Sequence, residues 1–292
     1  MHQHAFKTLK ASTLFSVVGR IALVTGGGRG VGEHIARALV ENGARVYIAS
    51  RSEATCKRTA SNLTAIGPGT CHALPSVDVS TQEGCSALVS ALESREEFLD
   101  ILVNNSGVSW GAPFDSFPEK EWDRVMALNV KSPFLMTRGC RKLLEVGAAK
   151  GLAEGDPTLP PLPSTILNIG SIVGLRPQPV PTYSYDASKA ALHSLTTKLS
   201  SELAPKITVN ALALGYVPTR MSRGLLHYGS GEALQRAIPM QRFGGAGDVA
   251  GATLFLTSRA GSWCTGSIFT VDGGTVAQPL RLVDTEETAE SK

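Results

Sequence analysis

The chain lacks the features that mark several large classes of protein. Its 292 residues include five cysteines, an odd number with no Cys-x-x-Cys pair, so we expect neither a disulfide framework nor a metal site. No stretch approaches the roughly 20 apolar residues that a membrane helix needs. Lysine and arginine form no block and the formal net charge is +3, which favours neither nucleic acid nor a membrane as partner. We expect a cytoplasmic protein.

The amino end lacks a clear targeting signal. Its first 20 residues contain Lys7, Lys10 and Arg20 and no acidic residue, a pattern found in transit peptides. The segment is not rich in arginine, however, and it leads directly into the first expected strand. We prefer to interpret it as a tail that is disordered or docks on the domain, and targeting is the alternative.

What the chain does have is an alternation of short β-rich runs with longer helical patterns, in a composition that is 42% hydrophobic and 18% charged. This alternation predicts an α/β fold, a single-domain, doubly wound parallel sheet of about seven strands with helices on both faces. The expected strands are residues 21–25, 45–49, 72–77, 101–104, 165–170, 208–213 and 268–271. The expected helices are residues 32–42, 53–65, 82–93, 120–146, 185–203 and 248–256.

Residues 147–164 interrupt this alternation with a stretch rich in glycine and proline. Such a composition does not sustain a helix, so we expect a loop insertion at the surface before the fifth strand. A linker between two domains is the alternative. The same β/α alternation continues on either side, which favours one domain.

A glycine-rich turn, Thr-Gly-Gly-Gly-Arg-Gly-Val-Gly, follows the first expected strand and ends at Gly32. Gly26 allows a tight turn, Gly30 allows the close approach of a phosphate, and Gly32 lets the next helix pack on the strand. Arg29 and Val31 lie within the same turn. A strand, a glycine turn and a helix present backbone N–H groups where a pyrophosphate binds, although such a turn can also be purely structural.

The second expected strand ends in Ala-Ser-Arg and lacks an acidic residue. Enzymes that prefer the unphosphorylated dinucleotide usually place an acid there to hold a ribose hydroxyl. Arg51, preceded by Ser50 and with Arg29 as a second cation, is suited to pair with a 2′-phosphate. We therefore expect NADP(H) rather than NAD(H). The alternative is that both arginines are solvated surface residues.

Tyr185 and Lys189 lie four residues apart in an expected helix and therefore share one of its faces. A nearby fixed cation stabilises a phenolate and lowers the pKa of a tyrosine from about 10 toward neutrality. Tyr185 is thus a candidate proton donor to a carbonyl oxygen, or proton acceptor from an alcohol. A nucleotide turn together with this pair predicts an oxidoreductase.

These motifs resemble those of the short-chain dehydrogenase/reductase family, whose members have the Rossmann fold. The resemblance covers residues 14–275, so we expect that domain to lie between an amino-terminal tail, 1–13, and a carboxyl-terminal tail, 276–292. Other residues match the family's motifs in order: Asp78 and Val79 at its adenine contacts, Asn105 and Gly107 in its Asn-Asn-Ala-Gly element, Asn129 and Ser171 in its catalytic tetrad with Tyr185 and Lys189, and Gly215, Val217 and Thr219 at its nicotinamide carboxamide site.

The resemblance implies hydride transfer between a nicotinamide and a carbonyl carbon. In that scheme Tyr185 donates a proton to the developing alkoxide, and Ser171 hydrogen-bonds the same oxygen. Lys189 lowers the pKa of the tyrosine and holds the ribose hydroxyls, and Asn129 anchors a water that relays protons. Leu214 departs from the pattern, because the family usually has a proline there, and the departure concerns substrate fit more than chemistry.

The sequence looks most like the 3-oxoacyl thioester (ACP) reductase branch, and in particular like reductases linked with rhamnolipid synthesis, while its insertion is similar to those of fungal members. The resemblance then implies a ketone substrate, which can be linked to a carrier protein or to CoA as a thioester. A reductase acting on an aromatic or polycyclic ketone of polyketide metabolism is the alternative. The residues expected on the substrate side are Trp110, Tyr183 and Tyr216, with Leu225, Leu226 and Tyr228 as a lid.

Two further classes of protein also have a glycine-rich, nucleotide-binding turn. A nucleotide-binding scaffold without turnover is the alternative of a different class, and the four tetrad residues argue against it. A glycine-rich methyltransferase would have an acidic residue after the second strand and no use for a Tyr–Lys pair, so the sequence disfavours this class. By resemblance, residues 120–146 and 185–203 also pair across a twofold axis, which implies a homodimer or homotetramer.

Overall fold

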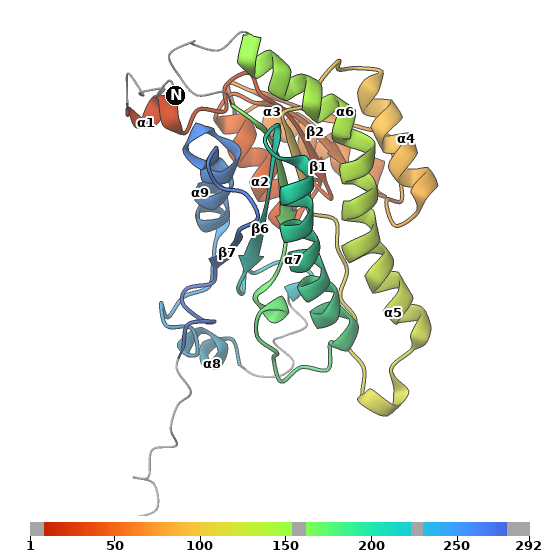
Figure 1. The fold of residues 1–292 in the computed structure, drawn as a ribbon. Helices are drawn as coiled ribbons and strands as arrows, with labels where there is room; N and C mark the ends of the chain where they lie inside the picture. Colours follow the sequence, from red (N-terminus) through yellow and green to blue (C-terminus); the bar gives the residue numbers. More distant parts are fainter. Residues whose placement is uncertain (1–8, 154–161, 223–229, 279–292) are drawn as a thin grey trace, which may run out of the picture.

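The computed structural model describes residues 9–153, 162–222 and 230–278. Its centre is a seven-stranded sheet in the order β3-β2-β1-β4-β5-β6-β7, and every neighbouring pair is parallel. The strands are β1 (Ile21–Thr25), β2 (Arg45–Ala49), β3 (Thr70–Ala73), β4 (Ile101–Asn104), β5 (Ser164–Ile169), β6 (Ile207–Leu214) and β7 (Ile268–Val271). The prediction of a doubly wound parallel sheet is confirmed (Figure 1).

Helices cover both faces of this sheet. They are α1 (Ala11–Leu14), α2 (Gly30–Glu41), α3 (Glu53–Thr64), α4 (Gln82–Glu93), α5 (Glu119–Met126), α6 (Ser132–Ala153), α7 (Tyr183–Leu203), α8 (Gly231–Arg236) and α9 (Ala246–Thr257). One core cluster joins α2, α3 and α9 to the sheet, and the other joins α4, α6 and α7. The sequence does not predict the short helices α1 and α8.

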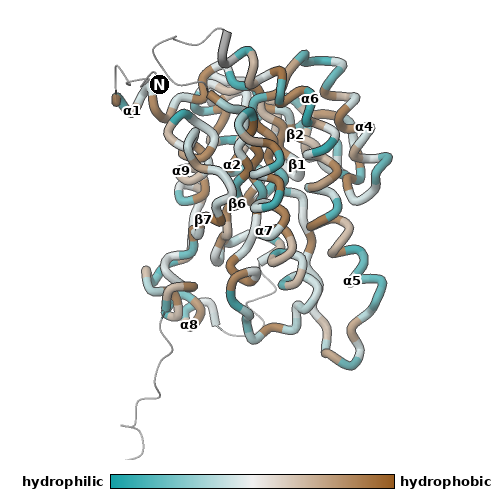
Figure 2. The backbone as a smooth tube through the Cα atoms, viewed as in Figure 1, coloured by the Kyte–Doolittle hydropathy of each residue, from teal (hydrophilic) through white to brown (hydrophobic). Residues whose placement is uncertain are grey.

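Alternation along β1 explains how one strand serves both cores. Ala22 and Val24 belong to the first cluster, and Ile21 and Leu23 to the second, because successive side chains of a strand point to opposite faces. All five residues of β1 are buried, as expected of a central strand that is covered on both sides. Hydrophobic residues accordingly concentrate in the central strands (Figure 2).

The region after α5 differs from the prediction in two ways. The expected single helix is interrupted by a π-helical turn, Ala127–Lys131, before α6. Helix α6 then continues to Ala153, so the insertion expected at 147–164 begins later; residues 154–161 lie outside the described residues. Gly147 is compatible with the helix because it packs against a strand end, where a Cβ would overlap the carbonyl oxygen of Leu99.

Strand β3 also lies earlier than the expected 72–77. Its four residues pair with Arg45 to Ile48 of β2, and Leu74 adds one more hydrogen bond to the Ile48 carbonyl, 2.9 Å long. The next residue is Pro75, which has no N–H to donate. The ladder therefore ends there.

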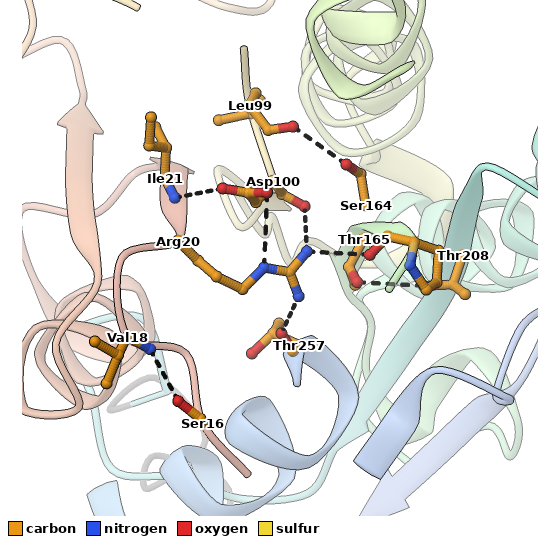
Figure 3. A network of polar contacts seen from close by, with 11 residues as sticks. Ser16, Val18, Arg20, Ile21, Leu99, Asp100, Ser164, Thr165, Thr208 and Thr257 are labelled. Atoms are coloured by element: carbon orange, nitrogen blue, oxygen red, sulfur yellow. Dashed lines mark hydrogen bonds and ion pairs between the residues drawn. The ribbon is translucent and has the colours of Figure 1, made fainter. Parts of the chain in front are cut away.

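A buried arginine ties the amino ends of the strands together (Figure 3). Arg20 donates one hydrogen bond to the carbonyl of Thr257 at the end of α9, 2.6 Å long. It also donates to the carbonyls of Asp100 and Pro163, which immediately precede β4 and β5, at 3.2 and 3.1 Å. The Asp100 carboxylate accepts a hydrogen bond from the N–H of Ile21, 2.7 Å long. These contacts lie at the edge opposite the predicted site.

Candidate active site

The predicted site residues gather at the carboxyl edge of the sheet. Turns and loops that follow β1, β2, β4, β5 and β6 carry most of them, and the amino end of α7 carries Tyr185. Because the strands are parallel, their carboxyl ends meet at one edge. The strand order reverses between β1 and β4, and open α/β sheets bind ligands at that reversal.

The turn between β1 and α2 has the backbone that its glycines were predicted to allow. Gly26 and Gly30 have φ angles of 68° and 57°, in the left-handed region that favours glycine. A Cβ on Gly32 would overlap the carbonyl oxygen of Gly26, so α2 packs on the strand only with glycine there. Since α2 begins at Gly30, its amino terminus meets this turn, which is an arrangement that binds phosphate.

The loop after β6 approaches the same turn. A Cβ built on Gly30 would lie 3.4 Å from Cγ2 of Thr219. Val217 is buried, and a Cβ on Gly215 would lie 2.7 Å from Cα of Asp272. The two predicted contact regions, for phosphate and for carboxamide, are therefore neighbours. Leu214, in place of the family's proline, is the last residue of β6 and is buried in the core.

Asn105 has a more structural position than the sequence indicated. Its amide nitrogen donates to the carbonyl oxygens of Thr25 and Gly26, at 2.9 and 3.2 Å, and its N–H donates to Oγ1 of Thr25 at 3.0 Å. The side chain thus clamps the glycine turn onto the end of β4. Gly107 lies further along this loop, where a Cβ would be 3.3 Å from Oδ1 of Asn129.

Two cations lie beside the turn, as the choice of cofactor requires. Arg29 and Arg51 are both exposed, and neither guanidinium has a hydrogen bond or ion pair to another described residue. The pKa of Asp78 is lowered mainly by a backbone hydrogen bond from the N–H of Ser80 to its carboxylate, and the charge of Arg51 adds to this lowering. The Ser50 hydroxyl accepts from the N–H of Ser52, so it caps the strand end.

Val79, the second predicted adenine contact, is buried at 6% exposure and belongs to the second core cluster. Its carbonyl accepts a hydrogen bond from the Cys85 thiol, 3.1 Å long. Val31, in the glycine turn, is partly buried and packs against the first cluster. Both side chains thus anchor their loops to the domain.

The π-helical turn positions Asn129, which is 1% exposed. Its Oδ1 accepts from the N–H of Val108 and its Nδ2 donates to the carbonyl of the same residue, both at 2.9 Å. Nδ2 also donates to Oγ of Ser188, and that hydroxyl donates to the carbonyl of Tyr185. Asn129 therefore joins the loop after β4 to α7. Ser188 was not predicted as a site residue, although it lies inside the Tyr-Asp-Ala-Ser-Lys motif.

Lys189 is buried beneath the same edge, at 6% exposure. Its Nζ donates to the carbonyl of Ile169 at the end of β5, 2.7 Å away, and lies 5.5 Å from the centroid of the Tyr185 ring. Burial lowers the pKa of Lys189 to about 8. The ammonium thus faces the Tyr185 ring and the end of β5.

The pKa of Tyr185 differs from the sequence-based expectation. Burial raises it, a side-chain hydrogen bond with Ser171 opposes the rise, and the charge of Asp186 adds to it. The predicted lowering by Lys189 does not contribute to this shift in the protein alone, and the loss of hydration of the phenolate is its largest cause. Ser171 is 8% exposed and begins the turn after β5, where its Oγ accepts from the N–H of Val173 at 3.4 Å.

Aromatic rings lie near the amino end of α7. Tyr183, 41% exposed, meets Phe114 and Phe117 edge-on, with ring centroids 5.6 and 5.7 Å apart. Phe117 also meets Trp122 of α5 at 6.3 Å. We call these four residues the aromatic cluster. The side chain of Tyr183 thus contacts the 114–117 segment.

The other two predicted substrate residues lie apart from these ring contacts. Trp110, 38% exposed, lies under the guanidinium of Arg124, 5.6 Å from its ring centroid. Tyr216 packs on Phe243 with ring centroids 4.6 Å apart, in the loop after β6. The predicted lid residues Leu225, Leu226 and Tyr228 lie outside the described residues.

Over the described ranges, no helix is long and apolar enough to cross a membrane. The same residues contain no group of three or more histidine, cysteine, aspartate or glutamate side chains arranged to hold a metal ion. All five cysteines are free thiols.

Comparison with known proteins agrees with this geometry. Residues 26–276 match a family model described as Enoyl-(Acyl carrier protein) reductase. The chain is 42% identical over 262 residues to the rhamnolipids biosynthesis 3-oxoacyl-[acyl-carrier-protein] reductase of Pseudomonas aeruginosa, covering 89% of this chain and 97% of that protein. It is 30% identical to the short-chain dehydrogenase/reductase VdtF of Byssochlamys spectabilis, covering 93% and 97%.

A solved structure shares the whole architecture. The Pseudomonas aeruginosa RhlG/NADP active-site complex is 41% identical and superimposes with a TM-score of 0.82, covering 90% of this chain and 98% of that one. Three findings agree: the family model matches most of the chain, the Pseudomonas enzyme is 42% identical to it, and the solved structure shares its fold. This chain belongs to the short-chain dehydrogenase/reductase family.

Proposed function

We propose that this protein is an NADPH-dependent carbonyl reductase that reduces a ketone, with a 3-oxoacyl thioester as its substrate. The observation that carries the proposal is the convergence of Tyr185, Ser171 and Lys189 at the carboxyl edge of the sheet, beside a glycine turn. The relative from Pseudomonas aeruginosa, named as a 3-oxoacyl-[acyl-carrier-protein] reductase, supports the substrate class. Two relatives solved with NADP support the cofactor.

The residues present fit NADP(H). Gly26, Gly30 and Gly32 keep the turn free of side chains at the amino terminus of α2, where a pyrophosphate would lie. Arg29 and Arg51 provide two exposed guanidinium groups that form no ion pair within 4.0 Å with a described carboxylate, which leaves them available to a 2′-phosphate. When bound, the nicotinamide supplies the hydride.

Further predicted contacts complete this binding surface. The proposed set on the adenine side is Ser50, Asp78 and Val79, and on the nicotinamide side it is Gly215, Val217 and Thr219. Val31, Asn105 and Gly107 shape the loops between them. Asn105 holds the glycine turn through three hydrogen bonds, so its contribution is to fix the shape of the turn.

Tyr185 and Ser171 act on the ketone oxygen in this proposal. The phenol of Tyr185 is protonated at neutral pH, because burial raises its pKa, and it can therefore donate a proton as negative charge develops on that oxygen. Ser171, which hydrogen-bonds Tyr185, donates a second hydrogen bond to the same oxygen in this proposal. Both groups stabilise the developing alkoxide.

Lys189 and Asn129 support these two residues. The pKa of Lys189, about 8, leaves a buried positive charge near the Tyr185 ring at neutral pH, which favours the tyrosinate left after proton transfer. Asn129 fixes the loop after β4 against α7 through Val108 and Ser188. We propose that it also orders the water that returns the proton.

An aromatic or polycyclic ketone is the second candidate substrate. The aromatic cluster, Phe114, Phe117, Trp122 and Tyr183, lies beside the amino end of α7, and three of its rings are 40% exposed or more. Exposed rings near a site stack on flat apolar ligands as readily as they cover acyl chains. Trp110 and Tyr216 are proposed to line the substrate side with Tyr183.

We also propose a homodimer or homotetramer formed through α5, α6 and α7, in the cytoplasm. Four of the five free thiols are buried, as suits a reducing compartment. The domain boundaries at residues 14 and 275, with tails 1–13 and 276–292, stay a prediction. Residues 1–8 and 279–292 of those tails lie outside the described residues.

The test is the oxidation of NADPH, followed by its absorbance, with a panel of ketones. The panel contains an acetoacetyl thioester, longer 3-oxoacyl thioesters and aromatic polyketide-like ketones, and NADH is run in parallel. Turnover of thioesters with NADPH supports the proposal. Turnover of aromatic ketones alone would replace the substrate class, and tight NADPH binding without turnover of any ketone would favour a scaffold.

A further inference from the structure

A buried histidine that the proposed mechanism does not use lies directly below the predicted catalytic residues. His193 is on α7, four residues after Lys189 and therefore on the same face of the helix. It is 6% exposed, and neither of its ring nitrogens makes a hydrogen bond of normal geometry to a described residue, although the Gly174 backbone lies close enough to act on the ring. Burying a poorly paired polar ring is unfavourable, so an apolar side chain would be less costly in this place.

The imidazole lies under the turn that carries Ser171. A Cβ on Gly170, the residue before Ser171, would overlap Nε2 of His193. A Cβ on Gly174, at the other end of the turn, would lie 2.9 Å from Cε1 of the same ring and 2.6 Å from the backbone carbon of Lys189. The two glycines thus leave the space that the ring fills.

Lys189 contacts the same strand end. Its Nζ donates to the carbonyl of Ile169, and the next residue is Gly170, against which the imidazole packs. The ammonium and the imidazole therefore both lie against the two residues that lead into Ser171. Burial, and then the charge of Lys189, lower the pKa of His193 to about 4, with the Gly174 backbone opposing them. The ring is neutral beside the ammonium at neutral pH.

We propose that His193 is a positioning residue. Its ring packs against the turn that carries Ser171 and fixes the position of the Ser171 hydroxyl, so that this hydroxyl reaches both Tyr185 and the ketone oxygen. Ser171 follows Gly170 directly, so a shift of the peptide that rests on the ring displaces its hydroxyl. Displacements of about 1 Å at a catalytic group can lower a rate on the order of 10²-fold. The inference rests on the proposed function for its kinetic consequence, but its structural part does not.

The first test compares three variants with the wild type. His193→Ala removes the ring from below the turn, and His193→Gln keeps a neutral planar group of similar reach. Leu199→Ala is the matched control, because it opens a cavity under the same helix six residues further on, away from Ser171. We expect His193→Ala to lower kcat by roughly 10- to 100-fold while the Kd for NADPH stays at the wild-type value.

We expect His193→Gln to keep most of the wild-type kcat, and Leu199→Ala to lose stability without losing kcat. The proposal is overturned if His193→Ala and Leu199→Ala have the same kcat. It is also overturned if His193→Gln is as slow as His193→Ala, since filling the space under the Ser171 turn would then not be what sustains kcat.

A second readout does not depend on turnover. The hydrogen bond with Ser171 lowers the pKa of Tyr185, so displacing Ser171 raises it. Tyrosinate formation is followed by ultraviolet absorbance after stopped-flow pH jumps, with Tyr185→Phe identifying the step due to Tyr185. We expect that step at higher pH in His193→Ala and in Ser171→Ala, and unmoved in Leu199→Ala.

An unmoved step in His193→Ala would overturn the inference even in a fully active enzyme. A wild type that reduces no ketone would overturn the proposed function, while this titration still decides whether His193 positions Ser171.

Discussion

Replacing Lys189 with methionine is expected to make the protein more stable at neutral pH. In the folded state burial lowers the pKa of Lys189 from 10.5 to about 8. One pH unit corresponds to about 1.4 kcal/mol, so keeping this ammonium charged costs about 3 kcal/mol below pH 8. Methionine removes that cost but leaves the Ile169 carbonyl without its partner, a loss of about 1 kcal/mol. The net gain in the free energy of unfolding is about 2 kcal/mol.

The pH dependence identifies the cause. Between pH 8 and 10.5 the unfolded chain binds more protons at Lys189 than the folded chain, so the stability of the wild type rises with pH there. The advantage of Lys189→Met therefore shrinks over this window. Urea unfolding at pH 7 and at about pH 10 measures it, and Lys198→Met, an exposed lysine on the same helix, is the control. A methionine variant that is less stable at pH 7, or whose advantage is independent of pH, would refute the reasoning.

Three further predictions concern catalysis, cofactor choice and folding. Tyr185→Phe should lower kcat by about 10²- to 10⁴-fold while NADPH binding, measured by fluorescence titration, is unchanged; a loss of binding would contradict a role in proton transfer alone. Arg51→Ala should weaken NADPH binding by about 10- to 100-fold and leave NADH binding unaltered, because only one ligand carries the 2′-phosphate; equal weakening of both would count against that contact. Arg20→Met should lower the free energy of unfolding by about 3 kcal/mol in urea, since it leaves Asp100 and three carbonyls with fewer partners; a change below about 1 kcal/mol would show that the network in Figure 3 contributes little.

The pattern of short strands and longer helices was sufficient to predict the sheet and its two covering layers. This succeeds because a buried parallel strand must be apolar on both faces, as β1 is, whatever surrounds it. The predicted end of β3 was wrong because Pro75, inside the expected strand, cannot donate to the ladder, whereas the end of α6 depends on contacts that are distant in sequence. Gly147 lies in a helix because it packs on Leu99, and no local pattern contains that information.

The features of the candidate active site likewise fall into those that the sequence predicted and those that it did not. The spacing of Tyr185 and Lys189 and the glycines of the turn could be read directly, since local geometry fixes a helix face and a left-handed φ. The direction of the Tyr185 pKa could not, because it depends on how much water the folded chain removes from the phenol.

The structural position of Asn105 and the place of Ser188 between Asn129 and Tyr185 likewise depend on the packing of separate elements. The sequence by itself determined which chemical groups this protein carries and in what order they follow one another along the chain. Only the tertiary structure decided which of them touch and how far each is removed from water, because burial and long-range hydrogen bonds are properties of the folded chain.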